Sequence, residues 1–298
     1  MARTTVLAAA ALGGALALTA GIAAPASAHS GGPGQSGGGH VTNYVALGDS
    51  YTSGPGIPDQ VDANCARSSR NYPSLVAADQ RFAGFKDVSC GGATTAEMWK
   101  PQGTNGPQLD ALNHRTTLVT VQIGGNDVGF GNIIRTCAGL SVTDPTGNPC
   151  QKYFGASGTD QLTLNIQQTA PKIEAVLDAI HGRAPRARVV VVGYPDLLPD
   201  NGVGCRPAVP FADKDFGYLK DTEKALNTML RRQARAGHAE FVDTYRPTIG
   251  HDMCKAPADR WIEPLVPASP AAPAHPNAKG EQVMAGAVLD RIDHCRNH

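Results

Sequence analysis

Two apolar segments, Leu118–Ile123 ("LVTVQI") and Val189–Val192 ("VVVV"), constrain the fold of this chain most strongly. Both are dense in β-branched residues and lack the alternation of apolar and polar side chains shown by a strand with one solvent-facing side. Strands of this kind are typical of parallel sheets, because helices cover both faces of such a sheet. The two segments therefore predict strands in the interior of a layered structure.

Further strand and helix candidates alternate along the chain. The strand candidates are Asn43–Leu47, Phe85–Ser89, Leu118–Ile123, Arg188–Val192 and Glu240–Val242, and the helix candidates include Tyr72–Asp79, Gln161–His181, Phe216–Ala236 and Lys279–His294. This alternation implies βαβ crossovers. We therefore predict an α/β fold, a three-layer α/β/α sandwich with a central parallel sheet of about five strands. Ligands of such sheets bind beyond the carboxyl ends of the strands.

The N-terminal segment, residues 1–28, is predicted to be a secretory signal peptide. A weakly basic start and an apolar run precede Ala26-Ser27-Ala28, an A-x-A site, so cleavage is expected near Ala28. An uncleaved membrane anchor is the competing interpretation, but the run is rich in Ala and Gly and ends in small residues. Residues 29–40 are Gly/Ser-rich and predict a flexible linker. One domain is expected over 41–298, in a secreted protein.

The charge balance and the motif content exclude several classes of function. Lys+Arg and Asp+Glu number 26 each, so no electrostatic feature suggests nucleic acid as a partner. The sequence contains no H-E-x-x-H, no EF-hand loop and no G-x-G-x-x-G that follows a strand and opens a helix. We therefore expect no metal and no cofactor.

Seven cysteines in an exported chain favour disulfides over metal ligands. By proximity along the chain, the preferred pairs are Cys65–Cys90, Cys137–Cys150 and Cys205–Cys254, with Cys295 left over. Six cysteines permit fifteen connectivities, so spacing alone makes this pairing a preference.

Three strand candidates are followed by loops whose residues could perform chemistry. Gly48-Asp49-Ser50 follows the first, "CGGATT" (Cys90–Thr95) the second, and "GGND" (Gly124–Asp127) the third. Each loop taken alone is typical of ordinary turns, in which Gly, Asn, Asp and Ser are common. Together at one sheet edge they supply a hydroxyl, backbone N–H groups and a carboxamide, which are the parts of a nucleophile with an oxyanion hole.

A serine hydroxyl needs a base to accept its proton. Of the nine histidines, His275 lies on a Pro-rich loop just before a helix candidate, and Pro276 restricts its backbone to an extended conformation. A plain surface histidine is the alternative interpretation of His275.

These segments resemble the SGNH hydrolases, also called GDSL esterases and lipases. "GDSY", Gly92, "GGND" and "HPN" occur in the order of that family, and its four marker positions correspond to Ser50, Gly92, Asn126 and His275. The wider context looks most like the secreted actinobacterial branch of lipases, esterases and phospholipases. That branch typically carries three disulfides, and the resemblance implies the sequential pairing given above.

The resemblance also implies a role for each marker residue. Ser50 would be the nucleophile and His275 the general base. The backbone N–H groups of Ser50 and Gly92 and the side chain of Asn126 would form the oxyanion hole. Asp49 would orient the turn rather than react.

One position departs from the family pattern. The family often has Asp three residues before the histidine, and here that residue is Ala272. The group that orients His275 is therefore either a main-chain carbonyl within Ala271–Pro273, with Ala272 and Pro273 as the candidates, or a distant carboxylate. We favour the carbonyl, because the Pro-rich loop is stiff and lies beside the ring. The carboxylate candidates are Asp252, Asp259 and Glu263.

The function expected from these residues is hydrolysis of lipid acyl esters through an acyl-enzyme on Ser50. The expected partner is a lipid or small-molecule ester, with transient contact to a lipid surface, no nucleic acid, and a monomeric protein. A carbohydrate O-acetyl esterase with the same residues is the alternative, and a non-catalytic secreted binding protein is a third reading. The substrate groove is expected to be shaped by loops at Gln102–Leu109, Phe130–Gly158 and Leu198–Phe211.

Overall fold

Five parallel strands form the central sheet of the computed structural model, which describes residues 43–294. The strand order is β4-β1-β5-β6-β7, and the bounds are β1 Asn43–Gly48, β4 Gly84–Asp87, β5 Leu118–Gln122, β6 Arg188–Val192 and β7 Glu240–Val242. All four pairings are parallel and in continuous register. The predicted signal peptide (1–28), the linker (29–40) and Cys295 lie outside the described residues.

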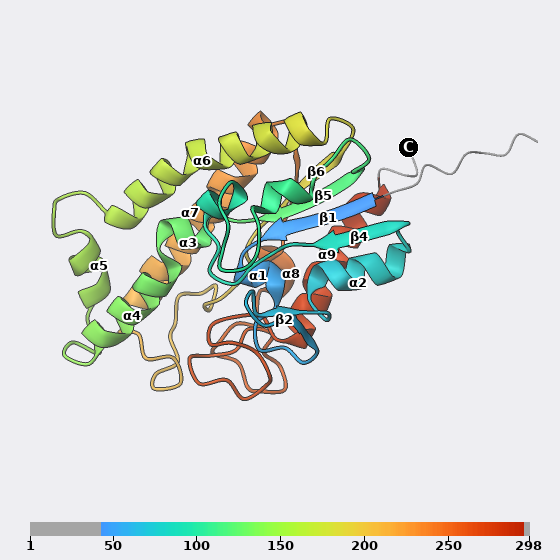
Figure 1. Ribbon diagram of the computed structural model, residues 1–298. Helices are drawn as coiled ribbons and strands as arrows, with labels where there is room; N and C mark the ends of the chain where they lie inside the picture. Colours follow the sequence, from blue (N-terminus) through green and yellow to red (C-terminus); the bar gives the residue numbers. More distant parts are fainter. Residues whose placement is uncertain (1–42, 295–298) are drawn as a thin grey trace, which may run out of the picture. The chain divides into compact units, whose positions relative to one another are not determined.

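Helices cover both faces of this sheet (Figure 1). Helices α6 (Gln161–Arg183) and α7 (Asp215–Ala236) pack on one face, and α2 (Tyr72–Gln80) and α9 (Ala278–His294) pack on the other. The fold is therefore the predicted three-layer α/β/α sandwich.

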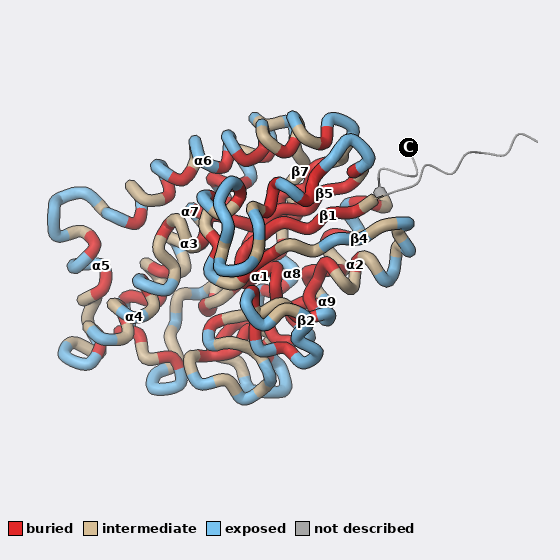
Figure 2. Tube along the Cα trace, viewed as in Figure 1, coloured by how far each residue is buried: buried red, intermediate tan, exposed pale blue. Residues whose placement is uncertain are grey.

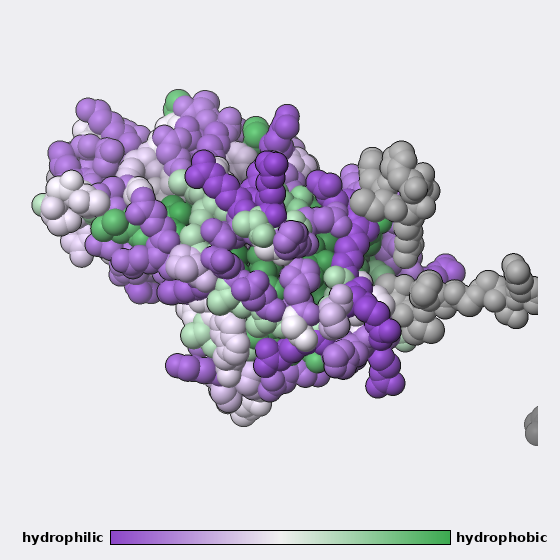
Figure 3. All heavy atoms as spheres, turned by 90° about the horizontal axis from the view of Figure 1, so that it is seen from above, coloured by the Kyte–Doolittle hydropathy of each residue, from purple (hydrophilic) through white to green (hydrophobic). Residues whose placement is uncertain are grey.

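Successive side chains of each strand enter opposite layers, as the pleat requires. Val119 and Val189 join the core beneath α6 and α7, whereas Leu118 and Val190 join the core beneath α2 and α9. The central strands β1, β5 and β6 are almost continuously buried (Figure 2). The surface seen from above is mostly hydrophilic, with apolar residues in small groups (Figure 3). Burial on both faces explains why the strand sequences lack polar alternation.

The segment 130–158, expected as a loop, contains two helices, so that expectation was wrong. Helix α4 covers Phe130–Ser141 and α5 covers Pro149–Phe154. In α4, Ile133 and Cys137 are buried at helical spacing, but glycines at 131 and 139 weaken the sequence signal. The remaining short elements are α1 Ser50–Ser53, β2 Gln60–Asp62, β3 Arg67–Ser68, η1 Thr95–Met98, η2 Gln108–Ala111, α3 Gly125–Val128 and α8 Tyr245–Thr248.

Three disulfides connect the described part of the chain. They are Cys65–Cys90, Cys137–Cys150 and Cys205–Cys254, the pairs that the family resemblance implies. The first joins the β2–β3 region to the loop after β4, and the second joins α4 to α5. No helix within residues 43–294 is long and apolar enough to cross a membrane.

Candidate active site

The sheet order brings the three polar strand-end loops together. Strand β1 lies between β4 and β5, so the loop that carries Ser50 lies between the loop that carries Gly92 and the loop that carries Asn126. The chain passes from β1 to β4 on one side and then to β5 on the other, which makes this edge the topological switch point where α/β sheets bind ligands. His275 reaches the same edge from the loop before α9.

Ser50 and His275 are in direct contact. The Ser50 Oγ atom lies 2.7 Å from Nε2 of His275, and Nδ1 of His275 lies 2.7 Å from the carbonyl oxygen of Pro273. A carbonyl oxygen can only accept a hydrogen bond, so the proton of the neutral ring is on Nδ1. Nε2 is then unprotonated and faces the serine hydroxyl as an acceptor, which is the arrangement that a general base needs.

Electrostatics keep this histidine in its neutral form. Burial lowers the pKa of His275 below its ordinary value, and the hydrogen bond to the Pro273 carbonyl acts in the opposite direction. The imidazole is therefore uncharged at neutral pH and ready to accept a proton.

The carboxylates considered as alternatives do not contact the His275 ring in the structure. Glu263 is fully buried and accepts hydrogen bonds from the N–H groups of Ala268 and Ser269 and from the Asn277 amide. Burial alone would raise the pKa of Glu263, but these hydrogen bonds outweigh it and the pKa lies below its ordinary value. Glu263 thus stabilises the loop that carries His275.

The other candidate groups lie away from the ring as well. Asp252 accepts the Cys254 N–H, and Asp259 contacts His251 through its carbonyl oxygen. Ala272 donates its N–H to the Pro55 carbonyl. Of the two candidate carbonyls, the one on the imidazole is that of Pro273.

Gly92 adopts a left-handed backbone conformation, with φ at 80°. Its N–H and that of Ser50 have no hydrogen-bond acceptor within residues 43–294, so both remain available to a ligand. The preceding residue is held in place, because the Gly91 N–H donates to the Cys65 carbonyl at 2.8 Å and the Gly91 carbonyl accepts from Gln102 Nε2 at 2.7 Å.

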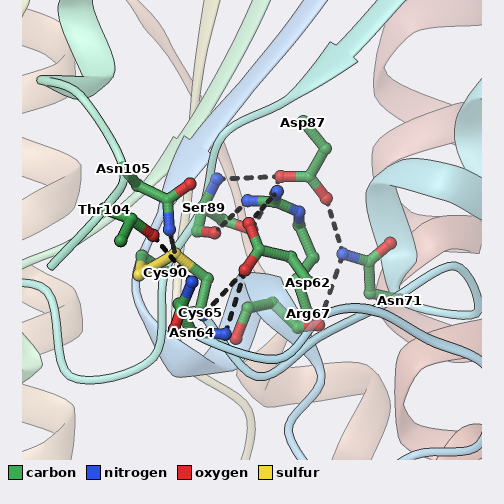
Figure 4. A network of polar contacts seen from close by, with 11 residues as sticks. Asp62, Asn64, Cys65, Arg67, Asn71, Asp87, Ser89, Cys90, Thr104 and Asn105 are labelled. Atoms are coloured by element: carbon green, nitrogen blue, oxygen red, sulfur yellow. Dashed lines mark hydrogen bonds and ion pairs between the residues drawn. A yellow bond between two sulfur atoms is a disulfide. The ribbon is translucent and has the colours of Figure 1, made fainter. Parts of the chain in front are cut away.

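A polar network fixes the segment that leads to Gly92 (Figure 4). Arg67 pairs with Asp62 at 2.8 Å and donates to the Ser89 carbonyl at 2.7 Å. Asp87 accepts from the Ser89 hydroxyl and from the Asn71 amide. Together with the Cys65–Cys90 disulfide, these contacts hold the loop after β4 in one conformation.

Asn126 follows β5 and faces the same loop. Its Nδ2 donates one hydrogen bond, at 2.8 Å, to the carbonyl of Ala93, which leaves the second amide hydrogen for a ligand. The next residue, Asp127, accepts from both the N–H and the hydroxyl of Thr95, at 2.8 and 2.6 Å, and pairs with Lys172. Asp127 therefore fastens the Asn126 loop to the Gly92 loop, a role that the sequence alone did not suggest.

Asp49 has a structural position beside Ser50. Its carboxylate accepts the Tyr51 N–H at 2.9 Å, as an N-cap of α1, and the Tyr194 hydroxyl at 2.5 Å. Tyr194 in turn accepts the Gly125 N–H at 2.8 Å. Burial raises the pKa of Asp49 to about 7, against the hydrogen bonds from Tyr194 and Tyr51. Tyr194 was not among the predicted residues, although it follows a strand end and could have been found on that ground.

Tyr51, the residue after Ser50, supports the imidazole of His275. Its ring stacks on the imidazole of His275 with the centroids 4.7 Å apart, and its hydroxyl donates to the Ala274 carbonyl at 2.6 Å. Ala274 has φ at 58°, which is a left-handed and strained conformation for a residue with a Cβ. Tyr51 thus holds the turn that presents His275.

A mainly apolar cavity adjoins Ser50. The cavity volume is about 80 Å³, enough for several water molecules or a stretch of alkyl chain. The walls come from α3, α4, α7 and the segment after β6, and include Val128, Phe130, Ile133, Leu198, Leu219 and Leu226. Within the described residues, no group of three or more His, Cys, Asp or Glu side chains could hold a metal ion.

Comparison with known proteins identifies the family of the chain. Residues 46–283 match the model of the GDSL-like lipase/acylhydrolase family. Lipase 2 of Streptomyces coelicolor is 41% identical over 254 residues, which cover 83% of this chain and 85% of that protein. An esterase of Streptomyces scabiei is 32% identical over 298 residues, which cover 85% of this chain and 86% of that protein.

Two solved structures are similar over nearly their whole length. Phospholipase A1 from Streptomyces albidoflavus has a TM-score of 0.71 and 28% identity, and covers 84% of this chain and 99% of its own. An extracellular lipase from Streptomyces rimosus has a TM-score of 0.70 and 31% identity, with the same coverage. The chain belongs to the GDSL-like lipase/acylhydrolase family, which confirms the resemblance to SGNH hydrolases, and it is a carboxylic ester hydrolase.

Proposed function

We propose that this protein hydrolyses acyl esters of lipids, with Ser50 as the nucleophile and His275 as the general base. The observation that carries the proposal is the 2.7 Å contact between Ser50 Oγ and His275 Nε2, backed by the Pro273 carbonyl on Nδ1. A serine beside an oriented, neutral imidazole has the proton acceptor that it needs in order to attack an ester.

In the acylation step, Ser50 Oγ bonds to the ester carbonyl carbon while its proton passes to Nε2 of His275. The carbonyl oxygen becomes an oxyanion, and the N–H groups of Ser50 and Gly92 and the amide of Asn126 donate to it. One such donor is worth about 3–4 kcal/mol in acyl-transfer enzymes. The bond from carbon to the leaving oxygen then breaks, and the imidazolium returns the proton to the leaving alcohol.

In the deacylation step, His275 accepts a proton from a water molecule that attacks the acyl-enzyme. The second oxyanion collapses, the ester bond to Ser50 breaks, and the serine oxygen recovers its proton. While the ring is charged, the Pro273 carbonyl stabilises the imidazolium through the Nδ1 proton. This carbonyl takes the place of the Asp that the family often has at position 272.

The apolar cavity supports a lipid acyl group as the part of the substrate that is transferred. The cavity lies beside the nucleophile and its walls are mainly aliphatic and aromatic side chains. Each buried methylene contributes about 0.8 kcal/mol to binding, which rewards a long acyl chain over acetyl. The similar proteins named a lipase and a phospholipase A1 support the same substrate class.

An acyl-chain series tests this proposal. We expect kcat/KM for p-nitrophenyl esters to rise from acetate to medium chains, and phospholipid or triglyceride to be hydrolysed. Activity confined to acetyl esters would contradict the lipid proposal and favour the carbohydrate O-acetyl esterase. Ser50→Ala is the matched control for background hydrolysis.

We further propose that the protein is secreted after cleavage near Ala28 and acts as a monomer, with residues 41–298 as its catalytic domain. Three disulfides and the extracellular origin of the similar Streptomyces rimosus lipase support secretion. The N-terminal sequence of the protein from culture medium would test the cleavage site.

A further inference from the structure

A carboxyl group lies in the apolar wall of the cavity beside Ser50. Glu223 is on α7, and Leu219, Thr222 and Leu226 of the same helix also line the cavity. These positions recur at the spacing of one helix face. Glu223 is only 8% exposed, so it occupies a place in this stripe where an apolar side chain would be expected.

The oxygens of Glu223 are incompletely satisfied. Oε2 accepts the Leu197 N–H at 3.3 Å, which is long for such a bond, and Oε1 is buried with no hydrogen-bond partner among residues 43–294. Buried polar atoms without a partner are unfavourable and therefore rare in native proteins. The terminal torsion of a glutamate side chain is broad, so the carboxyl group can turn toward a ligand in the cavity.

The surroundings of Glu223 favour its uncharged form. Burial raises its pKa well above the ordinary value, the nearby Asp196 raises it further, and the Leu197 N–H and Lys224 act in the opposite direction. A neutral carboxyl group offers one O–H donor and one carbonyl acceptor.

We propose that Glu223 determines acyl specificity by hydrogen-bonding to a hydroxyl group on the acyl chain, so that the favoured substrates are esters of hydroxylated fatty acids. This inference rests on the proposed lipid esterase function. A plain alkyl chain in the cavity offers no hydrogen bond and leaves Oε1 of Glu223 without a partner. A chain with a hydroxyl at the matching carbon exchanges hydrogen bonds with it in both directions.

Matched substrates test the inference in the full-length mature protein. They are p-nitrophenyl decanoate and a series of monohydroxydecanoates, with the hydroxyl moved carbon by carbon along the distal half of the chain. In the unaltered protein, we expect kcat/KM for one position of the hydroxyl to equal or exceed that for decanoate. At the other positions it should fall about tenfold or more, because a buried hydroxyl then lacks a partner.

Two substitutions of Glu223 separate hydrogen bonding from packing. Glu223→Leu should raise kcat/KM for decanoate. It should also lower the specificity ratio, which is kcat/KM for the matched hydroxy ester divided by kcat/KM for decanoate, by about tenfold or more. Glu223→Gln keeps a donor and an acceptor and should preserve the ratio within about threefold. The control is Asp221→Asn on the same helix, whose side chain is 71% exposed and which should leave the ratio unchanged.

The outcomes are distinguishable. An equal penalty for the hydroxyl at every position in the unaltered protein would overturn the inference, and this result requires no variant to fold. The inference would also be overturned by an unchanged specificity ratio in a folded Glu223→Leu variant. A Glu223→Gln variant that loses the ratio as the leucine variant does would overturn it too. In both cases the esterase function stands. Failure of the unaltered protein to hydrolyse decanoate itself would overturn the proposed function together with the inference.

Discussion

Replacement of Tyr51 by Phe removes one hydroxyl group and tests how His275 is held. The Tyr51 hydroxyl donates to the Ala274 carbonyl at 2.6 Å, and both residues are almost fully buried. The aromatic ring, which stacks on His275, remains in the variant. The substitution therefore isolates the hydrogen bond from the stacking contact.

The magnitude of the effect follows from the burial of the Ala274 carbonyl. Among the described residues no other donor reaches this oxygen, so its loss of a partner costs about 1–3 kcal/mol. The left-handed conformation of Ala274 carries about 1–2 kcal/mol of strain, which favours relaxation of the turn once the bond is gone. We expect this relaxation to displace His275 from Ser50. Because each 1.4 kcal/mol added to the activation free energy lowers the rate tenfold, kcat should fall about 10- to 100-fold.

Steady-state kinetics with p-nitrophenyl butyrate and a thermal unfolding curve measure both consequences. We expect a lower kcat with little change in KM, and a midpoint lowered by about 2–4 °C per kcal/mol. Tyr153→Phe is the matched control, since Tyr153 is 56% exposed and lies on α5. A Tyr51→Phe variant with unchanged kcat and unchanged thermal midpoint would refute the assignment of Tyr51 as the residue that positions the base.

Three further predictions concern the site. His275 must be neutral to accept a proton, and its pKa is lowered, so kcat/KM should fall on the acid side with a midpoint below about pH 6.5. The same acid limb should persist in Asp49→Asn. A midpoint above pH 7 would contradict the assignment of this limb to His275. Asn126→Ala should lower kcat about 10²- to 10³-fold with a similar KM, and a loss under threefold would exclude its oxyanion role. Asp252→Asn and Asp259→Asn should each keep kcat within about threefold, whereas a loss of 10²-fold in either would assign that carboxylate to the imidazole.

The sheet was predictable because its signal is local. The β-branched segments at 118–122 and 188–192 are strands with nearly the predicted bounds, and polar loops at parallel strand ends must share one edge. The candidate oxyanion donors could therefore be grouped with Ser50 because each follows a strand of a parallel sheet. His275, 225 residues away from Ser50, could be paired with it only through the family resemblance.

The supporting contacts were not predictable, because they join residues far apart in the sequence. Tyr194 lies 145 residues from Asp49, and nothing in either local sequence specifies their hydrogen bond. The choice between the carbonyls of Ala272 and Pro273 depends on the left-handed turn at Ala274, a conformation that alanine rarely adopts. The cavity likewise depends on α4, whose glycines concealed a helix.

Covalent labelling tests the central claim, that Ser50 is the nucleophile, most directly. The protein is incubated with a p-nitrophenyl alkylphosphonate, which esterifies an activated serine and releases p-nitrophenol, and the modified peptide is identified by mass spectrometry. We predict one adduct per chain, on Ser50, with loss of activity in proportion to labelling, and no adduct in Ser50→Ala. An adduct on another serine, or a folded Ser50→Ala variant that still turns over esters, would contradict the account.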